Sequence, residues 1–195
     1  MKVVLAPFGS RGDVTPLLAL GQALRGRGHQ VVAAVPENAA AWTRGLGFEV
    51  APGIPDFRDC FDGTHLEWTV MTRAMARVGA SYAALEQAAR GADWIVGSMM
   101  QYAASSVAEQ LGARYAYVAL SPPYLRNRSL PMLVLPFRST PRFLQYVQWW
   151  VSDYAPPLFH ASLNRERGTR GLPPIGRIFD HVVESGRLFL AADEA

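Results

Sequence analysis

The sequence predicts an α/β domain with a central parallel sheet and helices on both faces. Two short apolar runs, residues 2–6 and 31–35, are long enough for buried strands and too short for helices. Between them, apolar residues and glycines recur at helical spacing, at Leu17, Leu20, Gly21, Leu24 and Gly28. A strand, a helix and a strand within about 35 residues make a βαβ unit, and the two strands of such a unit run parallel.

Later segments of the chain continue this alternation. A capping-box pattern at Thr64 and Glu67 predicts the start of a long helix, in which Gly79 is the expected break. Its buried face is expected to carry Leu66, Val70, Ala74, Val78, Tyr82 and Leu85. Further strands are expected at 48–50, 94–97, 115–120 and 188–191, and further helices at 38–45, before 111, at 158–167 and at 177–185.

The turn GSRGD leaves the first predicted strand at the edge of the sheet where parallel α/β proteins bind ligands. Its two glycines let the backbone approach a ligand, and Arg11 offers a fork of donors that suits a phosphate. Asp13 has two interpretations: it either caps the following helix or faces the crevice as a general base. Thr15 and Pro16 resemble an N-cap and a first helical residue, which weakens the capping interpretation.

The segment GSRGDVTPLLALGQALRGRGHQVVAAVPE resembles the amino-terminal signature of the family 1 glycosyltransferases of the GT-B fold, in their bacterial natural-product and sterol-type branch. The matching positions are Gly9, Ser10, Gly12, Asp13, Pro16, Gly28, His29 and Val31. A second segment, NRERGTRGLPP, matches the family pattern at Asn164, Arg167, Gly171, Leu172, Pro173 and Pro174. The resemblance spans the whole chain and implies a Rossmann-like three-layer domain, the amino-terminal half of a GT-B fold.

The resemblance also implies how the domains are divided. Residues 1–195 would form a single acceptor-binding domain, and the carboxy-terminal nucleotide-sugar domain would be absent from this chain. No segment matches the histidine- and glycine-rich signature of that second domain. We therefore expect the chain to be inactive alone and to work with a nucleotide-sugar-binding domain in cis or in trans.

The implied reaction is an inverting, metal-independent transfer of a sugar from a UDP- or TDP-sugar to a hydroxyl of an apolar or aromatic acceptor, as in antibiotic biosynthesis. Asp13 matches the position of the catalytic base, where many relatives have histidine. A carboxylate is a weaker base than an imidazole, which favours an acidic acceptor such as a phenol. Ser10, Arg11 and Gly12 are expected to reach the donor pyrophosphate, and no cofactor is expected beyond the nucleotide-sugar co-substrate.

Seven side chains are candidates for binding a small-molecule acceptor: Trp68, Met71, Met75, Met99, Met100, Gln101 and Tyr124. The first three lie on a flank of the long predicted helix, and core packing is their alternative role, because aromatic and Met stripes usually pack. The next three follow a predicted strand and face the same crevice as Asp13. The last follows another strand, and its alternative is a surface position beside a proline turn.

The composition of the chain gives no support to nucleic-acid binding or to a metal site. Half of the residues are apolar and 18% are charged, which is typical of a folded chain, and the net charge of +3 gives no indication of nucleic-acid binding. The four histidines lie far apart in sequence, so no metal site is expected. With a single cysteine, Cys60, and neither a signal peptide nor an apolar stretch of about 18 residues, we expect a cytoplasmic location.

Two rival functions come from other classes. One is a non-catalytic subunit that binds a lipid or aglycone and presents it to a separate donor domain. The basic, aromatic stretch 126–150 would then be its active surface and would make peripheral contact with an anionic membrane. The other is an NAD(P)-binding domain of an oxidoreductase, against which the missing GxGxxG spacing counts.

Overall fold

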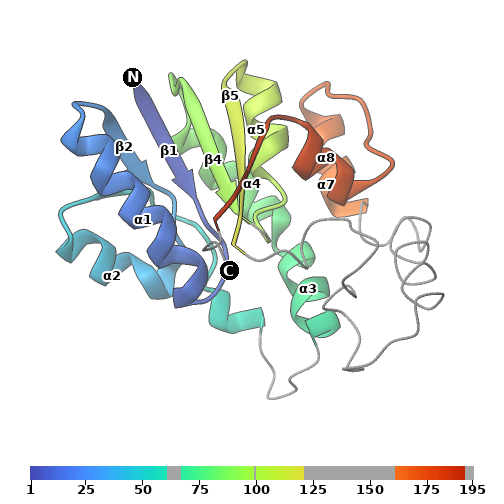
Figure 1. The fold of residues 1–195 in the computed structure, drawn as a ribbon. Coiled ribbons are helices and arrows are strands. Elements are labelled where there is room, and N and C mark those ends of the chain that lie inside the picture. Colours follow the sequence, from blue (N-terminus) through green and yellow to red (C-terminus); the bar gives the residue numbers. More distant parts are fainter. Residues whose placement is uncertain (61–66, 99, 121–160, 192–195) are drawn as a thin grey trace.

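The described part of the chain forms one sheet of six parallel strands in the order β3-β2-β1-β4-β5-β6. The structure is a computed structural model, and it describes residues 1–60, 67–98, 100–120 and 161–191 (Figure 1). The strands are β1 (Lys2–Ala6), β2 (Gln30–Ala33), β3 (Glu49–Val50), β4 (Trp94–Ser98), β5 (Arg114–Ala119) and β6 (Arg187–Leu190). The helices are α1 (Arg11–Gly26), α2 (Glu37–Gly45), α3 (Glu67–Ala76), α4 (Val78–Ala88), α5 (Ala104–Leu111), α7 (Ala161–Thr169) and α8 (Ile178–Glu184), with a short 3-10 helix, η1 (Phe57–Cys60). The predicted α/β fold is confirmed.

Strand β1 lies inside the sheet, between β2 and β4. Leu5 pairs with Ala33 of β2 and with Val96 of β4, which fixes the register on both sides. Side chains of β1 alternate between the two faces of the sheet, and those from Val3 to Ala6 are all buried. Because helices cover both faces, the strand is a continuous apolar run in the sequence.

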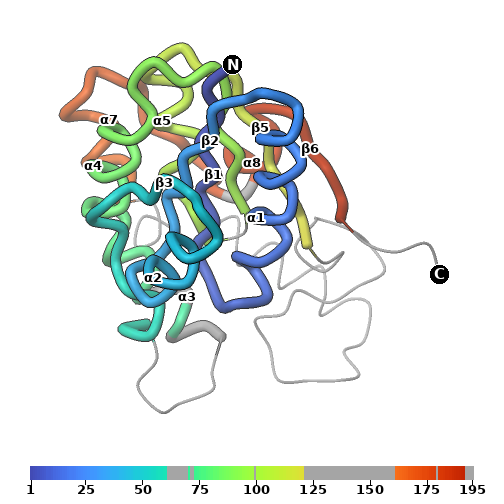
Figure 2. Tube along the Cα trace, turned by 90° about the vertical axis from the view of Figure 1, so that its left-hand side faces the viewer, coloured from blue at the N-terminus to red at the C-terminus, as the bar shows by residue number. Residues whose placement is uncertain are grey.

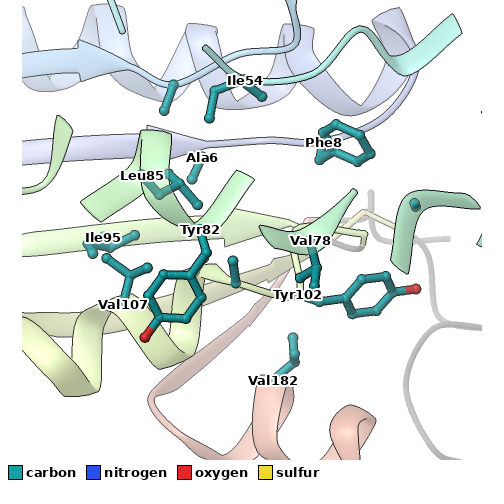
Figure 3. Close-up of a cluster of buried hydrophobic side chains, with 14 of the residues drawn as sticks. Ala6, Phe8, Ile54, Val78, Tyr82, Leu85, Ile95, Tyr102, Val107 and Val182 are labelled. Atoms are coloured by element: carbon teal, nitrogen blue, oxygen red, sulfur yellow. The ribbon is translucent and has the colours of Figure 1, made fainter. Parts of the chain in front are cut away.

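Two apolar clusters fill the space between the sheet and its helices. Figure 2 shows α1 on one side of the strands and α4, α5 and α7 on the other. On the α1 side, Leu17 and Leu18 pack against the strands. On the opposite side, residues such as Tyr82, Leu85 and Val107 form the larger cluster (Figure 3). The domain is therefore the three-layer structure that the sequence predicts.

Helix α1 begins at Arg11, five residues before the start that was predicted at Pro16. The prediction was wrong because Ser10 supplies an earlier N-cap with an extended backbone. Pro16 lies inside the helix, where it removes only the N–H that would bond to the Gly12 carbonyl. Gly12 is exposed, so water can satisfy that carbonyl.

The long predicted helix is two helices, α3 and α4, which separate at Arg77. The predicted break at Gly79 is wrong, since Gly79 lies inside α4. A Cβ on Gly79 would come within 2.9 Å of Glu166 Oε1, so this glycine allows α7 to pack closely. The predicted buried face is confirmed at Val70, Ala74, Val78, Tyr82 and Leu85. Leu66 and the capping residue Thr64 lie outside the described residues.

The segment NRERGTRGLPP shapes the connection between α7 and α8. Asn164 Nδ2 donates to the Ile175 carbonyl at 3.0 Å, and Asn164 Oδ1 accepts from the Ile175 N–H at 2.9 Å. Arg167 Nε donates to the Pro173 carbonyl at 2.9 Å. Gly171 has a φ of 74°, a left-handed conformation that glycine adopts without strain. These contacts give the matched residues of this segment a structural role.

Arg167 also joins this connection to α5. Its side chain is only 2% exposed, and Nη1 donates to Ser106 Oγ and to Glu109 Oε2, both at 2.8 Å. The same nitrogen lies 3.4 Å from His181 Nε2. Both hydrogens of Nη1 are used by Ser106 and Glu109, so Nε2 accepts instead from the Ser106 hydroxyl, 3.2 Å away. The proton of the neutral imidazole is then on Nδ1, 3.1 Å from Ser185 Oγ.

The stability of the domain is expected to fall as the pH drops below about 6.5. Burial, followed by the Arg167 guanidinium, lowers the pKa of His181 from its ordinary value of 6.5, while Glu109 acts in the opposite direction. The unfolded chain therefore binds the proton more readily than the folded domain. The contribution of neutral His181 to the free energy of unfolding is full above pH 6.5, decreases as the pH falls below that value, and stops decreasing below the lowered pKa of the folded state. Urea midpoints measured across this range test the expectation. A His181→Asn variant should show a flatter profile, and equal slopes for the two proteins would contradict it.

Candidate functional site

The turn after β1 and the end of β4 lie at the same edge of the sheet. These strands are parallel and Ala6 pairs with Gly97, so the chain leaves both strands at neighbouring points. Helix α1 begins directly after the turn, and α5 begins six residues after β4 ends. Ligands of parallel α/β domains bind at this carboxyl edge, which makes residues 7–13, 98 and 100–104 the candidate site.

Asp13 is the third residue of α1 and takes part in capping that helix. Its Oδ2 accepts a hydrogen bond from the Ser10 backbone N–H at 2.6 Å and another from the Ser10 hydroxyl at 2.9 Å. Ser10 is the N-cap residue, so Asp13 contributes to the cap from position N3 and does not occupy the N-cap itself. Among the described residues, none donates to Oδ1. The carboxylate is thus held through one oxygen, and the other can accept a proton.

A Gly9→Ala substitution is expected to displace the Asp13 carboxylate. A Cβ on Gly9 would overlap Asp13 Oδ2 and lie 2.5 Å from Asp13 Cγ, so the contact with Ser10 would be lost. Losing a helix cap costs about 1 kcal/mol in the free energy of unfolding, which urea denaturation can measure. Gly12→Ala is the matched control, because its Cβ would meet only Ser10 Oγ at 3.6 Å. Equal stability of the two variants would contradict this role for Gly9.

The three residues predicted to contact a pyrophosphate, Ser10, Arg11 and Gly12, are all exposed at the start of α1. They differ in the donors that they offer. The N–H and hydroxyl of Ser10 both point to Asp13, so Ser10 has no free donor in this arrangement. The Arg11 guanidinium lies over the ring of Trp42 of α2, with Cζ 5.5 Å from the ring centroid. No hydrogen bond or ion pair joins this guanidinium to the described residues.

The candidate acceptor residues fall into two groups. Met75 is buried in the large cluster, Met100 is half-buried against it, and Gln101 is buried at the exit of β4. The position of Met75 agrees with the packing alternative. Gln101 Nε2 is buried and bonds to none of the described residues, which leaves both of its N–H donors unused near the edge of the sheet. The rest cannot be placed: Trp68 and Met71 belong to α3, but their side chains lie outside the described residues, as do Met99, Tyr124 and the stretch 126–150.

Two residues of the site have no counterpart in the sequence-based predictions. Ser98, the last residue of β4, is 1% exposed, and its hydroxyl forms no hydrogen bond with the part of the chain that the structure describes. A polar residue at the end of an apolar strand run was the available signal. Trp42 was not identified, because its contact with Arg11 joins two helices across 31 positions of sequence.

No metal centre is found among the residues that the structure describes: no three His, Cys, Asp or Glu side chains gather in a group that could hold an ion. His181 is engaged by Arg167 and Ser185, as described above. In the same part of the chain, no helix has the length and apolarity to cross a bilayer.

Comparison with known proteins gives consistent matches. Residues 3–128 match the family model described as the glycosyltransferase family 28 N-terminal domain. The chain is 31% identical to glycosyltransferase GtfE of Amycolatopsis orientalis, over 93% of this chain and 46% of that protein. It is 29% identical to the vancomycin aglycone glucosyltransferase of the same organism, over 92% and 46% of the two chains.

The fold is matched as well. The crystal structure of glycosyltransferase VinC in complex with DTDP aligns with a TM-score of 0.60 at 16% identity, over 93% of this chain and 47% of that one. The chain therefore spans about half the length of the relatives that it matches. Together with the six-stranded parallel sheet, the family match confirms the expected resemblance to GT-B glycosyltransferases: the chain belongs to the glycosyltransferase family 28 N-terminal domain family.

Proposed function

We propose that this chain is the acceptor-binding half of an inverting glycosyltransferase, which moves a sugar from a UDP- or TDP-sugar to a hydroxyl of an apolar or aromatic natural product. The observation that carries the proposal is the Asp13 carboxylate, held by Ser10 through Oδ2 at the carboxyl edge of the sheet. Its Oδ1 accepts no hydrogen bond from the described residues. The named relatives support the substrate class, since one of them acts on the vancomycin aglycone.

In the proposed reaction, the acceptor hydroxyl attacks the anomeric carbon of the sugar. The bond between that carbon and the diphosphate oxygen breaks, and the nucleoside diphosphate leaves. Asp13 Oδ1 takes the hydroxyl proton as the new bond forms. A base held by a cap has little freedom to turn away, which favours the geometry that general-base catalysis requires.

The donor diphosphate is assigned mainly to Arg11 and Gly12. The N–H donors of Arg11 form no hydrogen bond with the described residues, and Gly12 presents exposed backbone at the start of α1. A helix N-terminus favours an anion, which adds to the attraction. Ser10 could contribute only if its hydroxyl left Asp13. The VinC structure contains DTDP, in agreement with a donor of this chemical class.

The proposal also assigns residues to the acceptor and names the partners of the domain. Met100 and Gln101 lie beside the exit of β4, and Gln101 can donate to an oxygen of an otherwise apolar acceptor. We assign the nucleotide sugar to a second domain, in cis or in trans, with no metal ion or further cofactor and a cytoplasmic location.

A binding titration tests this assignment. The domain would be titrated by calorimetry with polyketide, sterol and peptide aglycones, and separately with UDP- and TDP-sugars. We expect at least one aglycone to bind with a defined stoichiometry and nucleotide sugars to bind weakly. Tight binding of a nucleotide sugar or of NAD(P), without aglycone binding, would overturn the proposal.

A further inference from the structure

We propose that Trp42 is a positioning residue, whose ring holds the Arg11 guanidinium at the carboxyl edge of the sheet with its N–H donors free for a diphosphate. This role rests on the proposed function, in which Arg11 contacts the donor. It adds a residue from α2 to a site otherwise built from the exits of β1 and β4.

The contact is formed by two neighbouring helices. Arg11 is the first residue of α1, and Trp42 lies on α2, which packs beside α1 (Figures 1 and 2). Trp42 is half-buried and packs against the cluster that contains Leu17 and Phe48. Its ring is therefore fixed by the core, whereas Arg11 is exposed. The indole ring thus restricts the conformation of the arginine side chain, whereas the core and not the arginine fixes the ring.

The chemistry of the contact leaves the arginine able to bind. A guanidinium carries five N–H donors in its plane, and a cation–π contact uses the face of that plane. Arg167 and Arg170 differ, because their N–H groups are committed to carboxylates at 2.7–2.9 Å. Arg11 has no such bond with the described residues, so its edge can bind two phosphate oxygens at once.

An Arg11 side chain that is already held in place before the diphosphate arrives should bind it more tightly. A free arginine loses rotamer freedom when it binds a ligand, and that loss weakens the affinity. A side chain that already rests on a ring loses less. The second pair of this kind on α1 provides a comparison: Arg25 lies over Phe48, with Cζ 5.0 Å from the centroid, near the far end of the helix.

The experiment is a titration of the whole chain with inorganic pyrophosphate, followed by the NMR signals of the Arg11 Nε–H and the Trp42 indole N–H. In the wild-type protein the ring current should displace the Arg11 signals, and pyrophosphate should shift both resonances along one saturable curve. Arg11→Gln is expected to weaken pyrophosphate binding about tenfold. Trp42→Leu should weaken it about three- to fivefold, and Trp42→Phe, which keeps a ring, less than twofold.

Arg25→Gln is the matched control and should leave the affinity within about twofold. If Arg11→Gln weakens binding while Trp42→Leu does not, the positioning role is overturned and the donor contact stands. If pyrophosphate does not bind, or if Arg11→Gln has no effect, the donor contact in the proposed function fails as well. An equal loss in Arg25→Gln would mean attraction by net charge alone and would also overturn the role. The wild-type NMR shifts need no substitution, so they decide the matter even if Trp42→Leu does not fold.

Discussion

An Asp13→Asn variant is expected to lose transfer activity by about 10²–10⁴-fold in kcat, the usual contribution of a general base. The amide keeps the size of the side chain and can still accept from Ser10 through its oxygen, so the start of α1 should survive. It cannot take a proton from the acceptor hydroxyl. Product formation is measured by mass spectrometry with a nucleotide-sugar-binding half present in cis or in trans.

Glu37→Gln is the matched control for this experiment. Glu37 is an exposed carboxylate in the first turn of α2, at the same edge of the sheet, and no hydrogen bond ties it to the described residues. Its neutralisation should leave kcat nearly unchanged. A loss of less than tenfold for Asp13→Asn would indicate that Asp13 is only a cap, whereas equal losses in both variants would indicate a general effect of negative charge at this edge.

The substitution Arg167→Met, which removes a buried arginine, is expected to lower the free energy of unfolding by about 3 kcal/mol. This value is the lower end of the range for breaking a buried ion pair. The lower end applies because Glu109 is 40% exposed and water can solvate it once the arginine is gone. The loss comes mainly from the Pro173 carbonyl and the Ser106 hydroxyl, which lose their donor. Urea denaturation gives the value directly.

Arg177→Met serves as the comparison, since that side chain is 55% exposed and pairs with Asp180 at 3.1 Å. An exposed pair contributes little, so the variant should differ from wild type by less than about 1 kcal/mol. If Arg167→Met lost no more than this, the network around α5, α7 and α8 would not stabilise the domain.

The fold could be predicted because its determinants are local. The apolar run of β1, the helical spacing of Leu17 and Leu24, and the run from Val31 each identify one element, and their order implies parallel strands. A helix boundary is misplaced where two start signals compete. Thr15 and Pro16 resemble a helix start, yet the pair formed by Ser10 and Asp13 begins the helix earlier.

The site could be predicted only in part, for a physical reason. Asp13 and Arg11 lie in one short turn, so their proximity follows from the sequence. Trp42 reaches Arg11 only because α1 and α2 pack together, and that packing depends on the core beneath them. Met75 is a residue type that suits either a pocket or a core, and its burial depends on the packing of α3, which no local pattern specifies.

The position of β1 inside the sheet has a consequence for synthesis on the ribosome. Of the strands in this sheet, β1 is made before the others and pairs with β2 soon afterwards, but its other edge stays open until β4 follows, about ninety residues later. A nascent chain that ends before Trp94 therefore exposes an apolar strand edge, the kind of surface on which chaperones act and aggregates begin.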